Sequence, residues 1–164
     1  NTNQTTTTTT TTQQTDNTQT VDNTQQTQQT EVATEATTQA TTAAPVAAPA
    51  GSTGVDLANY ACQFVGNPYV YGGSSLTNGT DCSGFVMSVY SAFGVSLPHS
   101  SSALRSVGYG VSYEEMQPGD IVCYSGHVGI YAGNGQLLHA STYRTGITYS
   151  NVNYKNILAI RRIF

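Results

Sequence analysis

The sequence has no tryptophan, little charge, and only three cysteines and three histidines among its 164 residues. No apolar run reaches the roughly 20 residues that a membrane-spanning helix needs, so we expect no membrane insertion. Lysine and arginine together number five, against nine aspartates and glutamates. A surface basic enough to bind nucleic acid or an anionic membrane is therefore not expected either.

The first 50 residues lack glycine, aromatic side chains, lysine and arginine, and 20 of them are threonine. They offer too little apolar surface to offset the entropy lost on ordering, so their composition predicts disorder. The stretch ends in AAPVAAPAGSTG, where proline stiffens the chain as in an extracellular spacer. We expect residues 1–54 to be a linker to an upstream region that precedes Asn1. A glycosylated stalk or an adhesive segment is the alternative.

The remaining 114 residues hold all 16 glycines. They are formally neutral, because the four acidic residues of the first 50 account for the net charge of −4. This length and composition predict one folded domain with a single core, over residues 55–164.

Two helices are predicted early in this domain. In VDLANYACQFVG, Asp56 can cap the helix and Gly66 can end it. Its apolar residues recur at helical spacing: Leu57, Tyr60, Ala61 and Phe64. CSGFVMSVYSAFG predicts a second helix closed by Gly94, and LPHSSSALRSVG predicts a short third one capped by one of Ser100 to Ser102.

After Tyr109 the pattern changes to short β-rich runs separated by Gly, Asn and Ser. The turn QPGD precedes five of them: IVCYS, HVGIYAG, QLLHAS, GITYSN and ILAIRRIF. Helices followed by strands that pair through short loops indicate an α+β fold, with the N-terminal helices packed on a small antiparallel sheet.

The stretch TDCSGF puts Cys82 at the predicted start of the second helix. There the unpaired N–H groups would favour the thiolate and lower the cysteine pKa from about 8.5 to roughly 3.5–7.5. The same groups would stabilise an oxyanion, and Gly84 would leave room for a substrate carbonyl. Asp81 can cap the helix, and Ser83 can hydrogen-bond a ligand. This arrangement predicts a nucleophilic Cys82, with burial in the core as the alternative.

A nucleophilic cysteine needs a base, and the strand runs supply His127 and His139. If residues 133–135 form a three-residue loop, Ala132 faces Gln136 and both histidines lie on one face of the hairpin. A two-residue loop would place them on opposite faces. We expect the longer loop, in which His139 orients His127 and stabilises its protonated form.

Other roles for these residues stay open. Cys82, His127 and His139 could hold zinc, although the sequence has neither a Cys-x-x-Cys nor a His-Glu-x-x-His spacing. Cys62 and Cys123 are expected to pack in the core. A disulfide between them is the alternative, and it would leave Cys82 as the odd, free thiol.

Six stretches, in this order and at these separations, resemble one family: GNPYVYGG, TDCSGFV, LPHSS, QPGDIV, GHVGIY and LLHAS. It is the family of NlpC-type cell-wall cysteine peptidases, a bacterial branch of the papain-like fold, and the resemblance covers about residues 56–164. The resemblance implies Cys82 as the nucleophile, His127 as the general base and His139 as the orienting third residue. It also implies that neither a metal nor another cofactor is needed.

The resemblance implies a set of substrate-binding residues as well. Tyr69 matches a tyrosine whose hydroxyl lies beside the catalytic cysteine, and Asp81 and Ser83 match positions that bind the free amine end of a stem peptide. His99 and Ser101, in LPHSS, are further candidates. His99 stands where the family often has arginine, so it would bind a substrate carboxylate only when protonated. A plain surface role is the alternative for His99.

The resemblance therefore implies a peptidoglycan hydrolase, which we expect to be secreted or wall-associated and monomeric. It would cleave bacterial stem peptides, with the bond between D-γ-glutamate and the following diamino acid as the expected target, through an acyl-enzyme on Cys82. One alternative is amidase or acyl-transfer chemistry on the same thiol. The other is a non-catalytic wall-binding or adhesive module on a threonine-rich stalk.

Overall fold

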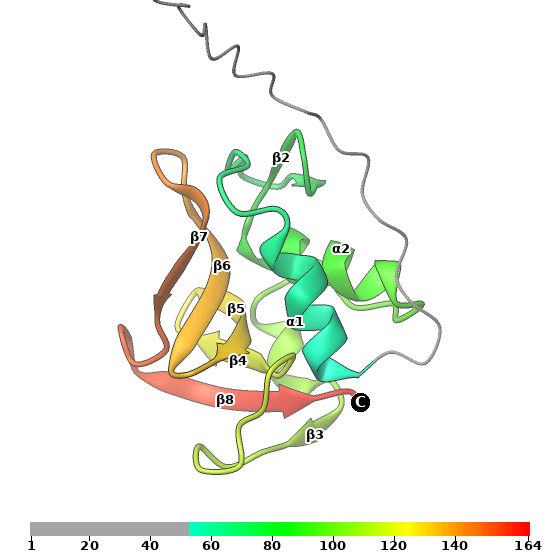
Figure 1. Ribbon diagram of the computed structural model, residues 1–164, viewed down its shortest axis with the longest axis vertical. Coiled ribbons are helices and arrows are strands. Elements are labelled where there is room, and N and C mark those ends of the chain that lie inside the picture. The colour runs from blue at the N-terminus through cyan, green and yellow to red at the C-terminus, as the bar shows by residue number, and fades with distance from the viewer. Residues whose placement is uncertain (1–52) are drawn as a thin grey trace, which may run out of the picture. The chain divides into compact units, whose positions relative to one another are not determined.

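The computed structural model describes residues 53–164, and its ribbon is drawn in Figure 1. The predicted disorder of residues 1–54 falls almost entirely on residues 1–52, which lie outside the described residues. The helices are α1 (Gly54–Cys62), α2 (Cys82–Ala92) and the 3-10 helix η1 (Ala103–Ser106). The strands are β1 (Ser74–Ser75), β2 (Gly79–Thr80), β3 (Tyr109–Gly110), β4 (Ile121–Tyr124), β5 (His127–Gly133), β6 (Gln136–Thr142), β7 (Gly146–Asn151) and β8 (Ile157–Arg162). The α+β class is confirmed, and all five predicted runs form strands.

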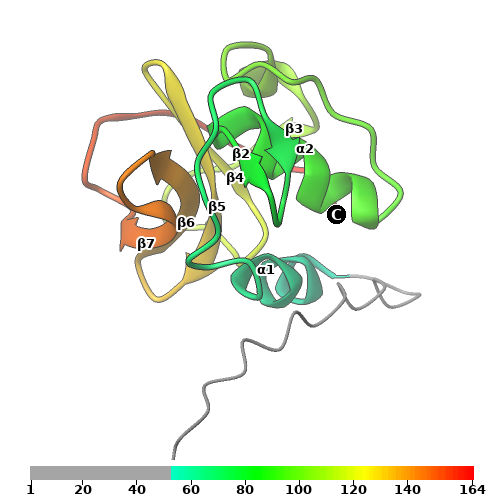
Figure 2. The same cartoon turned by 90° about the horizontal axis from the view of Figure 1, so that it is seen from above.

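Strands β3 to β8 form one antiparallel sheet in the order β3-β8-β4-β5-β6-β7, and β1 pairs with β2 in a separate ribbon. Figures 1 and 2 show α1 and α2 on the same side of β4, β5 and β6. Side chains of β4 alternate between the two faces. Ile121 and Cys123 belong to the core under the helices, whereas Val122 and Tyr124 belong to a second cluster. Within residues 53–164, no helix is both long and apolar enough to cross a bilayer.

Helix α1 begins with a capping motif that the sequence prediction missed. The Thr53 hydroxyl accepts a hydrogen bond from the Asp56 N–H (3.3 Å), and the Asp56 carboxylate accepts one from the Thr53 N–H (3.0 Å). Asp56 is therefore the acidic partner in a capping box, and its predicted role as the cap is wrong. The helix ends at Cys62, earlier than the predicted Gly66. Its predicted apolar face is buried: Leu57, Tyr60, Ala61 and Phe64.

Helix α2 starts at Cys82, as predicted, because Asp81 caps it. Oδ1 of Asp81 accepts a hydrogen bond from the Gly84 N–H at 2.7 Å. The apolar face of α2 is buried: Phe85, Val86, Val89 and Tyr90. The predicted third helix is the short η1, whose N-cap Ser102 makes no side-chain hydrogen bond to it.

The hairpin between β5 and β6 differs from the prediction at its turn. Gly133 pairs with Gln136, so the loop consists of Asn134 and Gly135 alone, and the predicted three-residue loop is wrong. Both loop residues have positive φ, 52° at Asn134 and 73° at Gly135. A type I′ turn requires this conformation, and Asn-Gly is the dipeptide that adopts it most readily.

A β-bulge next to the turn restores the predicted register in the body of the hairpin. Tyr131 pairs with Leu137, which leaves Ala132 as an extra residue on β5. This one-residue shift has the same effect on the strands as the three-residue loop. His127 and His139 therefore lie on the same face, as expected, although the cause is a bulge and not a longer loop.

Gly84 lets α2 pack closely against the segment around β1 and β2. A Cβ atom at this position would lie 2.1 Å from the Gly73 carbonyl oxygen, 2.8 Å from Thr80 Oγ1 and 3.0 Å from His99 Nε2. The prediction that Gly84 leaves room for a substrate carbonyl is therefore wrong, because protein atoms already occupy this space.

Replacing Gly84 with alanine should lower the free energy of unfolding by about 1–3 kcal/mol, because the added methyl group overpacks a site closed by backbone. Denaturant unfolding followed by circular dichroism measures the change. Ser91→Ala, at an exposed position of α2, is the control and should unfold like the wild type. Wild-type stability in Gly84→Ala would show that the β1–β2 segment moves away from α2 without cost.

Candidate active site

A pocket of about 480 Å³ brings Cys82 and His127 together. All five residues predicted to bind substrate line it: Tyr69, Asp81, Ser83, His99 and Ser101. Four residues that the sequence did not single out complete the lining: Tyr71, Gly72, Ser100 and Gly126. His139 does not line the pocket and is only 1% exposed. The predicted nucleophile, base and substrate-binding residues therefore meet in one place.

The environment of the Cys82 thiol does not favour a resting thiolate. Burial raises its pKa, and the nearby Asp81 carboxylate raises it further. Backbone N–H groups of Val128, Ser83 and Cys82 itself point toward the sulfur and oppose this effect, but they do not overcome it. The predicted lowering of the pKa is thus wrong for the resting site, because the half-buried sulfur also lies next to a carboxylate.

The two histidines form a hydrogen-bonded pair. Nε2 of His127 lies 2.6 Å from Nδ1 of His139, and the rings meet edge to face with their centroids 4.9 Å apart. Burial lowers the pKa of both imidazoles to about 4. His139 and then Lys155 add to the shift of His127, and Lys155 adds to that of His139. Both rings are therefore neutral near pH 7, and His127 is able to accept a proton. The prediction that His139 stabilises the protonated form of His127 is wrong, because His139 lowers the pKa of His127.

Ser150 extends this pair and was not found by sequence reasoning. Its Oγ lies 2.8 Å from Nε2 of His139, the nitrogen on the far side of the ring from His127. For Nδ1 of His127 to act as a base, the proton of this ring must lie on Nε2, from which it is donated to Nδ1 of His139. His139 then carries its own proton on Nε2 and donates it to Oγ of Ser150. Only the pairing of β6 with β7 could have pointed to Ser150. Thr148 lies directly opposite His139, and Ser150, two residues further along β7, is therefore the diagonal neighbour of His139.

Tyr154 is a second residue that the sequence analysis missed. Its ring lies 5.4 Å from that of His139 and 6.3 Å from that of His127, measured between centroids. Burial, with a further contribution from Cys82, raises its pKa to about 12, so the phenol stays protonated. Tyr69 also has a raised pKa, through burial and then Cys82 and Asp81, and it keeps a hydroxyl donor near the sulfur.

The Asp81 carboxylate has four hydrogen-bond partners within the protein, three at Oδ1 and one at Oδ2. Oδ1 accepts from Gly84 and Ser83 and lies 2.8 Å from Nε2 of His99, while Oδ2 accepts from the Gly72 N–H at 2.9 Å. Burial acts to raise the pKa of Asp81, but the hydrogen bonds from Gly84, His99 and Gly72 hold it below its ordinary value. His99 thus pairs with a carboxylate of the protein, although the sequence suggested a carboxylate of the substrate.

The structure also bears on the other two cysteines and on the alternative of a zinc site. Cys62 and Cys123 are free thiols: Cys62 is half-buried, and Cys123 is buried with its pKa raised by burial to about 11. In the described part of the chain, no three His, Cys, Asp or Glu side chains gather as a metal site. Both nitrogens of His139 already have hydrogen-bond partners, His127 and Ser150.

The family model of the NlpC/P60 family matches residues 66–160 of this chain. A probable endopeptidase of Mycobacterium tuberculosis is 41% identical over 97 residues, which cover 57% of this chain and 25% of that protein. The gamma-D-glutamyl-L-lysine dipeptidyl-peptidase of Bacillus subtilis is 34% identical over 126 residues, which cover 68% of this chain and 42% of that protein. This chain matches less than half of the length of either relative.

A solved structure agrees with these matches. The peptidoglycan hydrolase RipB from Mycobacterium tuberculosis aligns with a TM-score of 0.60 and 32% identity, over 66% of this chain and 64% of that one. The α+β arrangement is thus the papain-like fold that the sequence implied. Since the family model covers more than half of the sequence and the fold agrees, this chain belongs to the NlpC/P60 family.

Proposed function

We propose that this domain is a cysteine endopeptidase that hydrolyses peptidoglycan stem peptides. The observation that carries the proposal is the shared pocket, in which Cys82 opens a capped helix and His127 lines the same wall, backed by His139 at 2.6 Å. Relatives named as endopeptidases and as a peptidoglycan hydrolase support this substrate class. The bond between D-γ-glutamate and a diamino acid is the proposed target, as the name of the Bacillus relative suggests.

In the proposed mechanism the resting thiol and imidazole are both neutral. As Sγ of Cys82 attacks the scissile carbonyl carbon, its proton passes to Nδ1 of His127. The N–H groups of Cys82 and Ser83 at the start of α2 stabilise the oxyanion. His127 then gives its proton to the leaving amine as the C–N bond breaks. Water, deprotonated by His127, attacks the thioester, and the thiol leaves with that proton.

The pocket that contains Asp81 would hold the amine end of the peptide. The Asp81 carboxylate is anionic, with its pKa held low, and it attracts an ammonium group. Ser83 and Tyr69 add hydroxyl groups beside Cys82, and His99 and Ser101 complete the pocket wall. This arrangement would place the γ-glutamyl carbonyl at the sulfur and the diamino acid beyond it.

Because the proposed substrate belongs to the cell wall, we propose a secreted or wall-associated location. We also propose that residues 1–54 act as a linker from an upstream region and that the domain works as a monomer. Mass spectrometry of the products from defined stem peptides identifies the cut bond. Release of ammonia or transfer of the acyl group to an amine would instead assign amidase or acyltransferase chemistry.

Replacing Cys82 with alanine should lower hydrolysis of stem peptides by three orders of magnitude or more, because the attacking group is lost. The matched control is Cys62→Ala, which removes another half-buried thiol and should retain activity. Activity is measured by chromatography of the digests, and circular dichroism checks folding. Turnover retained by a folded Cys82→Ala protein would reject the mechanism, and wall binding without turnover in the wild type would indicate a binding module.

Alkylation of Cys82 by iodoacetamide should be slow at neutral pH and should accelerate as the pH rises past the ordinary cysteine value. The physical reason is that burial and Asp81 raise the thiol pKa, so the reactive thiolate forms only in alkaline solution. Mass spectrometry of the peptide that contains Cys82 follows the rate separately from Cys62 and Cys123. A fast rate that is constant across neutral pH would instead reveal a resting thiolate–imidazolium pair.

Replacing Ser150 with alanine should lower kcat about tenfold with little change in KM, because the buried His139 N–H loses its acceptor, at a cost of about 1–3 kcal/mol. Ser150→Thr keeps a hydroxyl and should restore most of kcat. Tyr149→Phe, at an exposed position on the opposite face of the same strand, is the control for changes in β7. Full kcat in a folded Ser150→Ala enzyme would show that the histidine pair does not depend on this acceptor.

A further inference from the structure

Lys155 is the only lysine in the chain and lies in the connection between β7 and β8. Its side chain is exposed, and Nζ lies over the Tyr154 ring, 5.5 Å from the ring centroid. The same ring lies beside His127 and His139, at centroid distances of 6.3 and 5.4 Å. Neither Tyr154 nor Lys155 lines the pocket that contains Asp81. A positive charge thus lies close to the histidine pair but outside this pocket.

The ammonium group of Lys155 is available to bind a ligand. Among residues 53–164, no carboxylate lies within salt-bridge distance of it. Three of the other four cations of residues 53–164 already have hydrogen-bond partners: Arg105 and Arg161 donate to backbone carbonyl oxygens, and Arg162 pairs with Asp120. The fourth, Arg144, lies over the Tyr143 ring. Apart from the face of the Tyr154 ring, the Lys155 ammonium therefore has no charged partner among residues 53–164.

This charge opposes the proposed chemistry unless an anion offsets it. During acyl transfer His127 must hold an additional proton, which makes its ring cationic. Lys155 disfavours that state: after burial and His139, its charge is a further cause of the lowered pKa of His127. It lowers the pKa of His139 as well, second to burial. An anion bound at Lys155 would remove this repulsion at the step that creates the imidazolium.

We propose that Lys155, held on the Tyr154 ring, binds a carboxylate of the leaving half of the substrate. This inference rests on the proposed function and adds a subsite to it. The residue that follows the cut bond is an amino acid, and at the end of a short peptide it bears a free α-carboxylate. With Asp81 in the pocket and Lys155 outside it, the two charges would orient the peptide, the ammonium end toward Asp81 and the carboxylate end toward Lys155.

The test uses the full chain and two peptides that differ in one group. Both have the sequence L-Ala-γ-D-Glu-L-Lys, and the final residue ends in either a carboxylate or a carboxamide. The wild type should cleave the acid with a kcat/KM about tenfold higher than the amide, a difference of about 1.4 kcal/mol. In Lys155→Gln this ratio should fall to about one, because the acid loses its ammonium partner and the lysine charge no longer opposes cleavage of the amide. Lys155→Arg keeps the charge and should keep a preference for the acid.

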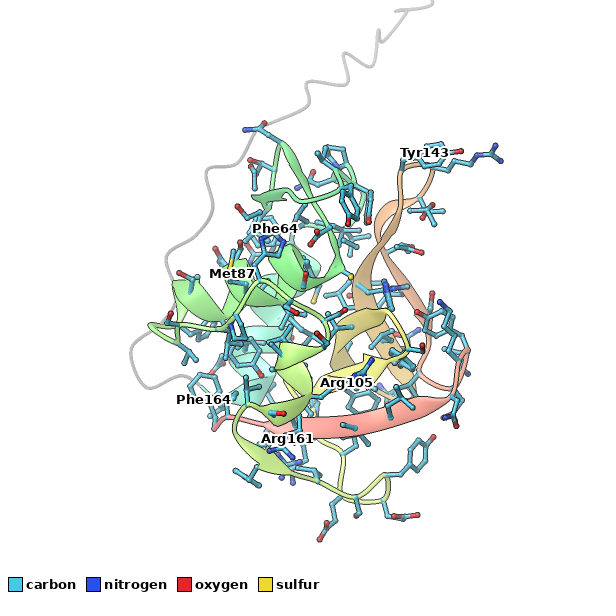
Figure 3. All side chains as sticks on the ribbon, turned by 180° about the vertical axis from the view of Figure 1, so that it is seen from behind. Phe64, Met87, Arg105, Tyr143, Arg161 and Phe164 are labelled. Carbon is cyan, nitrogen blue, oxygen red and sulfur yellow. The ribbon has the colours of Figure 1, made fainter. Side chains whose placement is uncertain are left out.

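The chain offers a matched control in Arg144, whose guanidinium group lies over the Tyr143 ring at 5.7 Å. This second cation on a tyrosine belongs to the connection between β6 and β7, and Figure 3 shows Tyr143 at its tip, pointing away from the rest of the domain. Arg144→Gln should therefore keep the wild-type ratio. A loss of the ratio in Arg144→Gln as large as in Lys155→Gln would indicate a general effect of charge and would overturn the subsite.

The remaining outcomes separate the two proposals. If the wild type cleaves both peptides equally well, or if Lys155→Gln keeps the tenfold preference, the subsite is wrong and the proposed function stands. If the wild type cleaves neither peptide, the proposed function fails and the subsite fails with it. NMR titration adds a readout that needs no turnover: the pKa of His127 should rise in Lys155→Gln, and an unchanged value would remove the electrostatic basis of the inference.

Discussion

The carboxylate of Asp81 is the interaction on which the placement of the site depends. It caps α2 through the Gly84 N–H, holds the loop before β1 through the Gly72 N–H, and pairs with His99. One largely buried anion therefore fixes three segments, and Cys82 is the residue that follows it. The same carboxylate that fixes the position of Cys82 also raises the pKa of its thiol. The Asp81 carboxylate thus holds Cys82 in place at the helix start, although its charge makes the thiolate of Cys82 less stable.

The histidine pair depends on irregularities in the sheet. A bulge at Ala132 sets the register of β5 against β6, and a second shift leaves Ser141 extra in β6 against β7. Bulges re-aim side chains and increase local twist, and they are common next to active sites. Between these two points His139 reaches His127 on one side and Ser150 on the other. The hydrogen-bonded chain from His127 through His139 to Ser150 thus depends on how the strands are paired. A regular hairpin with the same two-residue turn would put the two histidines on opposite faces and break it.

The sequence predicted most elements because apolar periodicity determines burial, but it failed where tertiary contacts decide. Strands β1, β2 and β3 have two residues each, too few to show a period. The cap Thr53 was overlooked because it lies in the stretch assigned to the linker, so Asp56 received its role. The family motifs placed Cys82 and both histidines in one site. Ser150 and Tyr154 lie outside those motifs and become visible only through strand pairing and ring contacts.

The raised thiol pKa and the lowered imidazole pKa values follow from one principle. Burying a charge is costly unless it is paired, and burying neutral groups is not. Cys82, His127 and His139 are neutral near pH 7, so the site avoids this cost. In the proposed mechanism, charge would appear only when the thiol gives up its proton. The helix N–H groups would then face the oxyanion, and the hydrogen bonds from His127 through His139 to Ser150 are already formed. The charge of Lys155 beside this pair adds to the lowering of both imidazole pKa values. In the proposed mechanism it would oppose protonation of His127 until a substrate anion offset it.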